Sequence, residues 1–167
     1  MNGATISDCG AFRYRLWRYW QGDKPLVFVM LNPSTADANA DDPTIRKCIG
    51  FAKRYGYGGI EVLNLYAYRA TKPADLKAAG YLVGPDNDKH FQAVIDSQME
   101  AGRTENWICA WGANARGLVR PLDVLEMLRM NGVRPRALHF TNDGIPAHPL
   151  MLSYGCGLKY IDAGVNA

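Results

Sequence analysis

VMLNPSTADANADDPT, residues 29–44, is the stretch of this sequence that decides the predicted fold. It begins inside a continuous apolar run, Leu26 to Leu31, of the kind found in strands that are covered on both faces. The run stops at Asn32-Pro33-Ser34-Thr35, so polar groups follow the carboxyl end of the strand. Ligands bind at that edge in open α/β sheets, because loops converge there and the next helix directs its positive N-terminus toward them. The stretch therefore predicts a central strand with a binding site at its end.

Patterns of helix and strand alternate along the rest of the chain. Asp42 is expected to cap a helix that has Pro43 at its first position and runs to Tyr55. The later elements are expected at Ile60–Leu65 (strand), about Asn87–Ala101 (helix), Trp107–Trp111 (strand), Leu122–Asn131 (helix) and Arg136–Phe140 (strand). Alternation with crossovers of this length predicts an α/β fold, a three-layer α/β/α sandwich with a central, mainly parallel sheet. We expect one domain over residues 1–167, with its α/β core at about 25–162.

Residues 12–20 precede this core and alternate basic with large apolar side chains. The pattern predicts a half-exposed edge strand or hairpin arm. Arg13, Arg15 and Arg18 are expected to form a solvated strand face; a track for phosphates is the less common alternative.

Composition limits the class of protein. The 167 residues are 48% apolar, and 19 basic against 16 acidic residues give a net charge of +3. This charge permits a phosphate-bearing ligand but does not by itself indicate nucleic acid. The four cysteines form no CxxC pair, so buried free thiols are expected. There is no apolar run as long as a membrane span and no signal-peptide core, which predicts a cytoplasmic protein without a membrane partner.

The predicted strand ends bring candidate site residues to one rim. These are Asn32, Asn64, Trp111-Gly112 and His148. Each has a plainer alternative: an Asn after a strand is often only a turn residue, and a His before a proline can simply bond a carbonyl group. The other tryptophans and His139 are expected in the core, and His90 on a solvated helix face. Walker, GxGxxG, zinc-deaminase and GxSxG signatures are absent.

A set of motifs resembles a bacterial and phage family, the domain of unknown function 1643. The motifs cover roughly Cys9 to Ile161 and are RYxLWR, MLNPSTAD, DDPTIRKC, GYGGIEVLNLYAYRAT, GPDND, AWGANAR and GIPAHPLML.

The order of these motifs is also similar to that of the uracil-DNA glycosylase superfamily. Leu31-Asn32-Pro33-Ser34 resembles its water-activating loop, Leu63-Asn64-Leu65 its base-reading strand end, residues 110–115 its Trp-Gly-like segment, and His148-Pro149-Leu150 its late His-Pro loop. Leu31 stands where that superfamily usually has Gly, and the second Ser-Pro of the late loop is missing.

The resemblance implies roles for particular residues in N-glycosidic hydrolysis. Asn32 would position water, Asn64 would read the base, and His148 would stabilise the departing base. The remaining residues implied in binding base or phosphate are Pro33, Ser34, Thr35, Tyr66, Arg69, Trp111, Gly112, Asn114, Arg116 and Pro149. Tyr66 or Tyr68 would supply the stacking platform. The expected partner is nucleic acid or a nucleotide, and no cofactor or metal is expected.

Two other functions compete with this one. Asp37, Asp41 and Asp42 lie close together after the first predicted strand, where carboxylates can hold Mg²⁺ against a phosphate. That would make the protein a metal-dependent phosphoesterase or nuclease. The third possibility is a nucleic-acid-binding module without catalytic activity.

Overall fold

The computed structural model describes residues 1–162 of the chain. Its elements are β1 (Asn2–Ile6), β2 (Arg13–Tyr19), β3 (Pro25–Met30), α1 (Pro43–Arg54), β4 (Gly59–Asn64), α2 (Pro73–Ala78), α3 (Asn87–Glu100), β5 (Trp107–Cys109), a 3₁₀ turn (Ala113–Ala115), α4 (Arg120–Met130), β6 (Arg136–Ala137) and β7 (Lys159–Tyr160). Within these residues, no helix is long and apolar enough to cross a membrane.

The strands form one seven-stranded sheet in the order β1-β2-β4-β3-β5-β6-β7. The central four strands, β4, β3, β5 and β6, are parallel. The outer strands pair antiparallel: β1 with β2 and β2 with β4 at one edge, and β6 with β7 at the other. The fold is thus mixed α/β. The prediction of a mainly parallel sheet is right for its centre only.

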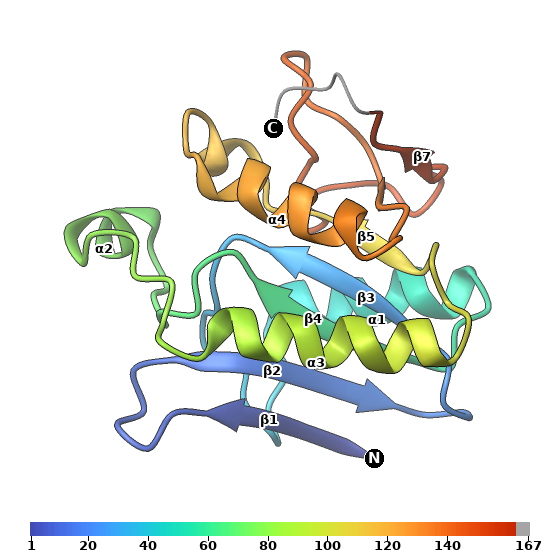
Figure 1. Ribbon diagram of the computed structural model, residues 1–167, viewed down its shortest axis with the longest axis horizontal. Coiled ribbons are helices and arrows are strands. Elements are labelled where there is room, and N and C mark those ends of the chain that lie inside the picture. The colour runs from blue at the N-terminus through green and yellow to red at the C-terminus, as the bar shows by residue number, and fades with distance from the viewer. Residues whose placement is uncertain (163–167) are drawn as a thin grey trace.

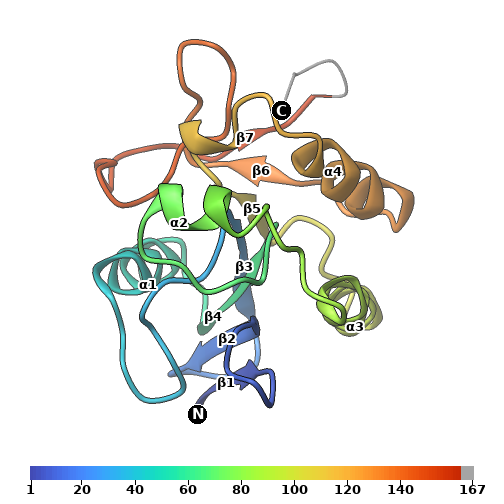
Figure 2. The ribbon, with the colours of Figure 1, turned by 90° about the vertical axis from the view of Figure 1, so that its left-hand side faces the viewer.

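Helices cover both faces of this sheet (Figures 1 and 2). On one face, Ile45, Cys48 and Phe51 of α1 pack against a cluster that includes Phe28 and Val62. On the other, α2, α3 and α4 contribute to a second cluster with the opposite side chains of the same strands. Figure 2 shows α1 on one side of the strands and α3 with α4 on the other. Since both faces are covered, all six residues of β3 are buried, as the apolar run predicts.

The local prediction for α1 is confirmed. Asp42 caps the helix, accepting a hydrogen bond from Ile45 N at 2.9 Å, and Pro43 occupies the first turn. The last predicted strands are shorter than expected. β5 ends at Cys109 and β6 has two residues, because the chain then leaves the sheet in turns such as the 3₁₀ turn after Gly112. The short elements β1, α2 and β7 were not predicted.

β2 is not an edge strand, and its arginines do not form a solvated face. β1 lies outside it, and only 2% of Arg13 and 3% of Arg18 are exposed. Arg15, the third, donates two hydrogen bonds to the buried carboxylate of Glu61, at 2.8 and 2.9 Å. The alternative of a hairpin arm is confirmed, because β1 and β2 pair antiparallel. The prediction of a solvated face is wrong, because period-two alternation is also compatible with buried arginines whose partners come from distant segments.

Six other side-chain predictions are corrected. His139 is exposed because it follows the truncated β6, and His90 is half-buried with its ring centroid 4.9 Å from that of Tyr14. Trp20 is 36% exposed, beyond the end of β2, and Trp17 is half-buried. Cys48 and Cys109 are buried as expected, but Cys156 is half-buried and Cys9 is exposed, in the turn of the N-terminal hairpin.

Candidate functional site

A cavity of about 240 Å³ lies at the carboxyl edge of the parallel strands. Seven of the predicted site residues line it: Asn32, Ser34, Asn64, Trp111, Gly112, Asn114 and His148. They come from four segments of the chain, each following or ending a central strand or lying in the late loop.

Backbone pairing explains why these segments meet. β3 and β4 are parallel and in register, with Met30 beside Asn64. The pairing continues past the strands, since Leu65 N donates to Met30 O at 2.8 Å and Ala70 N donates to Pro33 O at 3.0 Å. Gly112 N donates to Pro146 O at 2.9 Å, which joins the loop after β5 to the late loop. The two asparagines and the His148 loop are therefore held at one rim.

Asn64 is the least ordinary residue of the cavity. It ends β4, only 1% of it is exposed, and both its side-chain atoms, Oδ1 and Nδ2, lack a hydrogen-bond partner among residues 1–162. A buried polar group without a partner costs about 1–3 kcal/mol. A ligand with one donor and one acceptor side by side would satisfy both atoms.

One of the two polar atoms of the Asn32 side chain is hydrogen-bonded to the backbone. Its Nδ2 donates to Pro33 O at 3.0 Å and to Ala70 O at 2.8 Å, which fixes the turn after β3. Its Oδ1 has no partner in the described part of the chain and is left as an acceptor. The turn role and a role in the cavity are thus compatible in one side chain.

His148 presents one defined ring nitrogen to a ligand. Leu150 N donates to its Nδ1 at 3.2 Å, so the neutral ring carries its proton on Nε2. Burial lowers the pKa of His148 below its ordinary value, and the Asp42 carboxylate partly opposes this shift. Gly112 lets its loop approach His148 closely: it has φ of +81°, and a Cβ there would lie 2.9 Å from His148 Cβ. His148 is therefore a neutral imidazole whose Nε2–H can donate a hydrogen bond.

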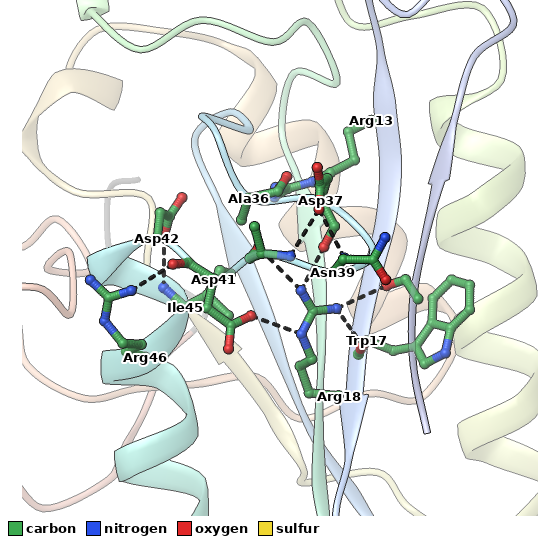
Figure 3. Close-up of polar contacts among 12 residues, drawn as sticks. Arg13, Trp17, Arg18, Ala36, Asp37, Asn39, Asp41, Asp42, Ile45 and Arg46 are labelled. Carbon is green, nitrogen blue, oxygen red and sulfur yellow. Dashed lines mark hydrogen bonds and ion pairs between the residues drawn. The ribbon is translucent and has the colours of Figure 1, made fainter.

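Two arginines of β2 hold the loop that forms one wall of the cavity (Figure 3). Arg13 Nη1 donates to Ala36 O at 2.7 Å, and Arg18 donates to Asp37 O at 2.5 Å and to Asp41 Oδ1 at 2.8 Å. Arg13 also lines the cavity, and its Nε has no partner among residues 1–162. Burial lowers the pKa of Arg13 to about 10, so its guanidinium stays charged at neutral pH.

The three loop carboxylates have separate structural roles. Asp37 Oδ1 accepts from Asn39 N and Ala40 N, Asp41 pairs with Arg18, and Asp42 caps α1. Those two backbone hydrogen bonds are the main reason why the pKa of Asp37 is lowered. Across residues 1–162, no group of three or more His, Cys, Asp or Glu side chains is placed to hold a metal ion. The idea of a metal site built from these three carboxylates is therefore not supported.

Several residues implied in binding lie outside the cavity lining. Tyr66 is in the core against Tyr81, so its ring is not a stacking platform, and Arg116 is exposed and paired with Asp143 at 2.6 Å. The others outside the lining are Pro33, Thr35, Arg69 and Pro149; Tyr68, the alternative platform, packs against Phe12. The cavity lining includes the aromatic side chain of Trp111 and the positively charged side chain of Arg13.

Sequence reasoning missed Arg13, Asp42 and Thr44 as lining residues. Sequence reasoning assigns Arg13 to a solvated face, and Asp42 to a helix cap or, in the alternative function, to a metal site. The hairpin pattern around Arg13 carries no signal of its contact with Ala36, which is 23 residues away. For Asp42 a signal existed, because a cap on the helix after the central strand necessarily lies at the carboxyl edge of the sheet.

A larger cavity, of about 870 Å³, lies at the other end of the strands. It is lined by Arg15, Tyr19 and Glu61 among others. The Glu61 carboxylate there is already satisfied by Arg15 and by Tyr19 Oη at 2.6 Å. The smaller cavity is the better candidate despite its size, because its buried polar atoms still lack partners.

Comparison with known proteins identifies the family of the chain. No curated protein and no solved structure matches the chain. The family model described as protein of unknown function (DUF1643) matches residues 13–150, which include the whole cavity lining, from Arg13 to His148. Since this match spans most of its length, the chain belongs to the DUF1643 family.

Proposed function

We propose that this protein binds a nucleobase in the cavity and hydrolyses the N-glycosidic bond that joins an unusual or modified base to its sugar. The substrate is a nucleic acid or a nucleotide. One observation carries the proposal: the amide of Asn64, buried and without partners, lines the same cavity as Asn32 and His148.

The polar atoms of the cavity match the edge of a pyrimidine. Asn64 offers a donor and an acceptor on one planar amide, the pattern needed to read a carbonyl beside a ring N–H. Burying this amide without partners lowers the stability of the protein, and a ligand that pairs with both of its atoms would remove that cost. A volume of about 240 Å³ is below the 300–1,000 Å³ of pockets for drug-sized molecules, so it suits a single ring better than a whole nucleotide.

Cleavage of the bond puts negative charge on the departing base. His148, neutral and donating from Nε2, is suited to hydrogen-bond an oxygen of that base as charge develops. Arg13 adds a positive charge to the same cavity. Asn32 Oδ1, which has no partner among residues 1–162, can accept a hydrogen bond from the attacking water.

We also propose that the fold is of the uracil-DNA glycosylase type, a three-layer α/β/α sandwich. Helices on both faces of the sheet and four parallel central strands support it. The motif order at the strand ends supports it as well. A fold does not determine an activity, so the function rests on the site.

The test is release of free base from oligonucleotides and nucleotides that carry uracil and modified pyrimidines. We expect His148→Ala to slow release by about 10²–10³-fold, the usual effect of losing one donor to developing charge. Asn32→Ala should lower turnover more than binding, whereas Asn64→Ala should weaken binding. Arg116→Ala, outside the cavity, is the control and should leave both unchanged.

The same panel distinguishes an enzyme from a silent binding module. If no substrate releases base, yet one binds equally well to the wild type and to Asn32→Ala, the protein is a binding module. If nothing in the panel binds at low salt, both forms of the proposal are wrong.

A further inference from the structure

The proposed hydrolysis needs a group that takes a proton from water, and the amide of Asn32 cannot do this. We propose that Asp42 is that base, a second role for the residue that caps α1. This inference rests on the proposed function, since it assigns a step of the same reaction.

The geometry of Asp42 leaves one carboxylate oxygen free. Oδ1 accepts from Ile45 N at 2.9 Å, and within residues 1–162 neither a hydrogen bond nor an ion pair engages Oδ2. The residue lines the cavity together with Asn32 and His148. Its neighbours Asp37 and Asp41 do not line the cavity. Asp37 accepts hydrogen bonds from the loop backbone, and Asp41 pairs with Arg18. Asp42 is thus the carboxylate of the loop that can reach a bound ligand.

Asp42 lies near other ionisable groups of the cavity. Among the residues that line the cavity, the ionisable ones are Arg13, Asp42 and His148. Asp42 is close enough to both partners to raise their pKa values, and it acts in the same direction on the buried thiol of Cys48. Asp42 is therefore the acidic group of the cavity lining, and Arg13 and His148 are its ionisable neighbours there.

In the proposed step, Asp42 Oδ2 takes a proton from a water molecule held by Asn32 Oδ1. The water oxygen forms a bond to the anomeric carbon of the sugar, and the bond from that carbon to the base nitrogen breaks. The electron pair of that bond leaves with the base, whose anion is stabilised by His148 Nε2–H and then takes up a proton. The products are the free base and a sugar hydroxyl, and Asp42 returns its proton to solvent.

Asp42→Asn separates the two roles of this residue. Asn caps helices as well as Asp does, so the melting temperature should be preserved while the basic oxygen is lost. Asp37→Asn is the matched control: it removes one negative charge from the same loop and keeps an oxygen that accepts from Asn39 N and Ala40 N. Both variants are compared with the wild type for base release, for binding of free uracil and by NMR titration of the His148 ring.

For Asp42→Asn we expect kcat to fall by about 10²–10⁴-fold, the range for a lost general base, with uracil binding unchanged. The pKa of His148 should fall further, because the Asp42 charge raises it. Asp37→Asn should change none of these.

The failures can be told apart. If the wild type releases base and Asp42→Asn is equally fast, or if the His148 pKa does not move, the inference is wrong and the proposed function stands. If the wild type releases no base, both are wrong.

Discussion

Replacing Asn64 by Leu should make the protein more stable and unable to bind its ligand. Leu keeps the branch point at Cγ and removes the two polar atoms that are buried without partners at the end of β4. Its additional methyl volume has the 240 Å³ cavity beside it. A side chain retained for function at the expense of stability should behave in this way.

The size of the gain follows from the burial of Asn64, which is 1% exposed. Leaving a buried donor or acceptor unpaired costs about 1–3 kcal/mol, and its removal recovers that amount. For a protein of 167 residues, each kcal/mol corresponds to about 2–4 °C in melting temperature, so about 2 kcal/mol predicts a rise of about 4–8 °C. Urea unfolding gives the free energy, calorimetry gives the melting temperature, and titration with free uracil gives binding.

Asn87→Leu is the control with the opposite sign. Asn87 is also fully buried, and its Oδ1 has no partner among residues 1–162, but its Nδ2 donates to Asn64 O at 2.9 Å and to Leu65 O at 3.3 Å. Its replacement removes the side-chain donor to Asn64 O, whereas Leu65 O still accepts from Arg120 Nε at 2.9 Å. The loss of this donor should lower stability by about 1–3 kcal/mol. If Asn64→Leu destabilises the protein as much as Asn87→Leu does, the Asn64 amide is satisfied in solution, and the argument that a ligand completes it fails.

Three further outcomes are expected. Arg18→Met removes a buried guanidinium and leaves Asp37 O without this donor, which should cost about 1–3 kcal/mol in urea unfolding, whereas Arg46→Met, on an exposed side chain, should stay within about 0.5 kcal/mol. Gly112→Ala should lower the melting temperature more than Gly117→Ala: both have positive φ, which costs about 1–2 kcal/mol, but only at Gly112 would the Cβ meet His148. Because the folded pKa of His148 is below 6.5, the unfolded chain binds more protons, so stability should fall as pH drops from 7.5 through 6.5, and His148→Gln should make this slope shallower.

The sequence predicted elements wherever one strong local pattern dominates. The apolar run at Leu26–Leu31 and the Asp42-Pro43 start of α1 are of this kind, and both are confirmed. Prediction was poor for β6 and β7, two residues each, since so short a strand exists only through its pairing partner. The pattern of residues 12–20 predicts a hairpin arm, but neither β1 nor the pairing of β2 with β4 could be located, because β1 has no alternating pattern and depends on pairing with β2.

The position of the cavity was predictable, but the charged residues that line it were not. Asn32, Asn64 and His148 follow from the rule that polar loops gather at the carboxyl ends of parallel strands. Arg13 precedes β3 in the chain and reaches the cavity only because β2 runs antiparallel beside β4. A contact of that kind depends on the tertiary structure, and no local sequence pattern around Arg13 predicts it.

The arginine anchors of the cavity loop also determine when in folding the site can exist. Arg13 and Arg18 reach carbonyl groups of the loop across 23 and 19 residues of chain, and the cavity closes only when the loops after β5 and before His148 meet. Pairings over such separations form slowly, after local helices. A slip of β2 by one residue would exchange Arg18 for Trp17 on the loop side, because successive residues face opposite sides of a sheet. The cavity therefore forms late in folding, and its shape depends on the register of β2, a strand that contributes one side chain, Arg13, to its lining.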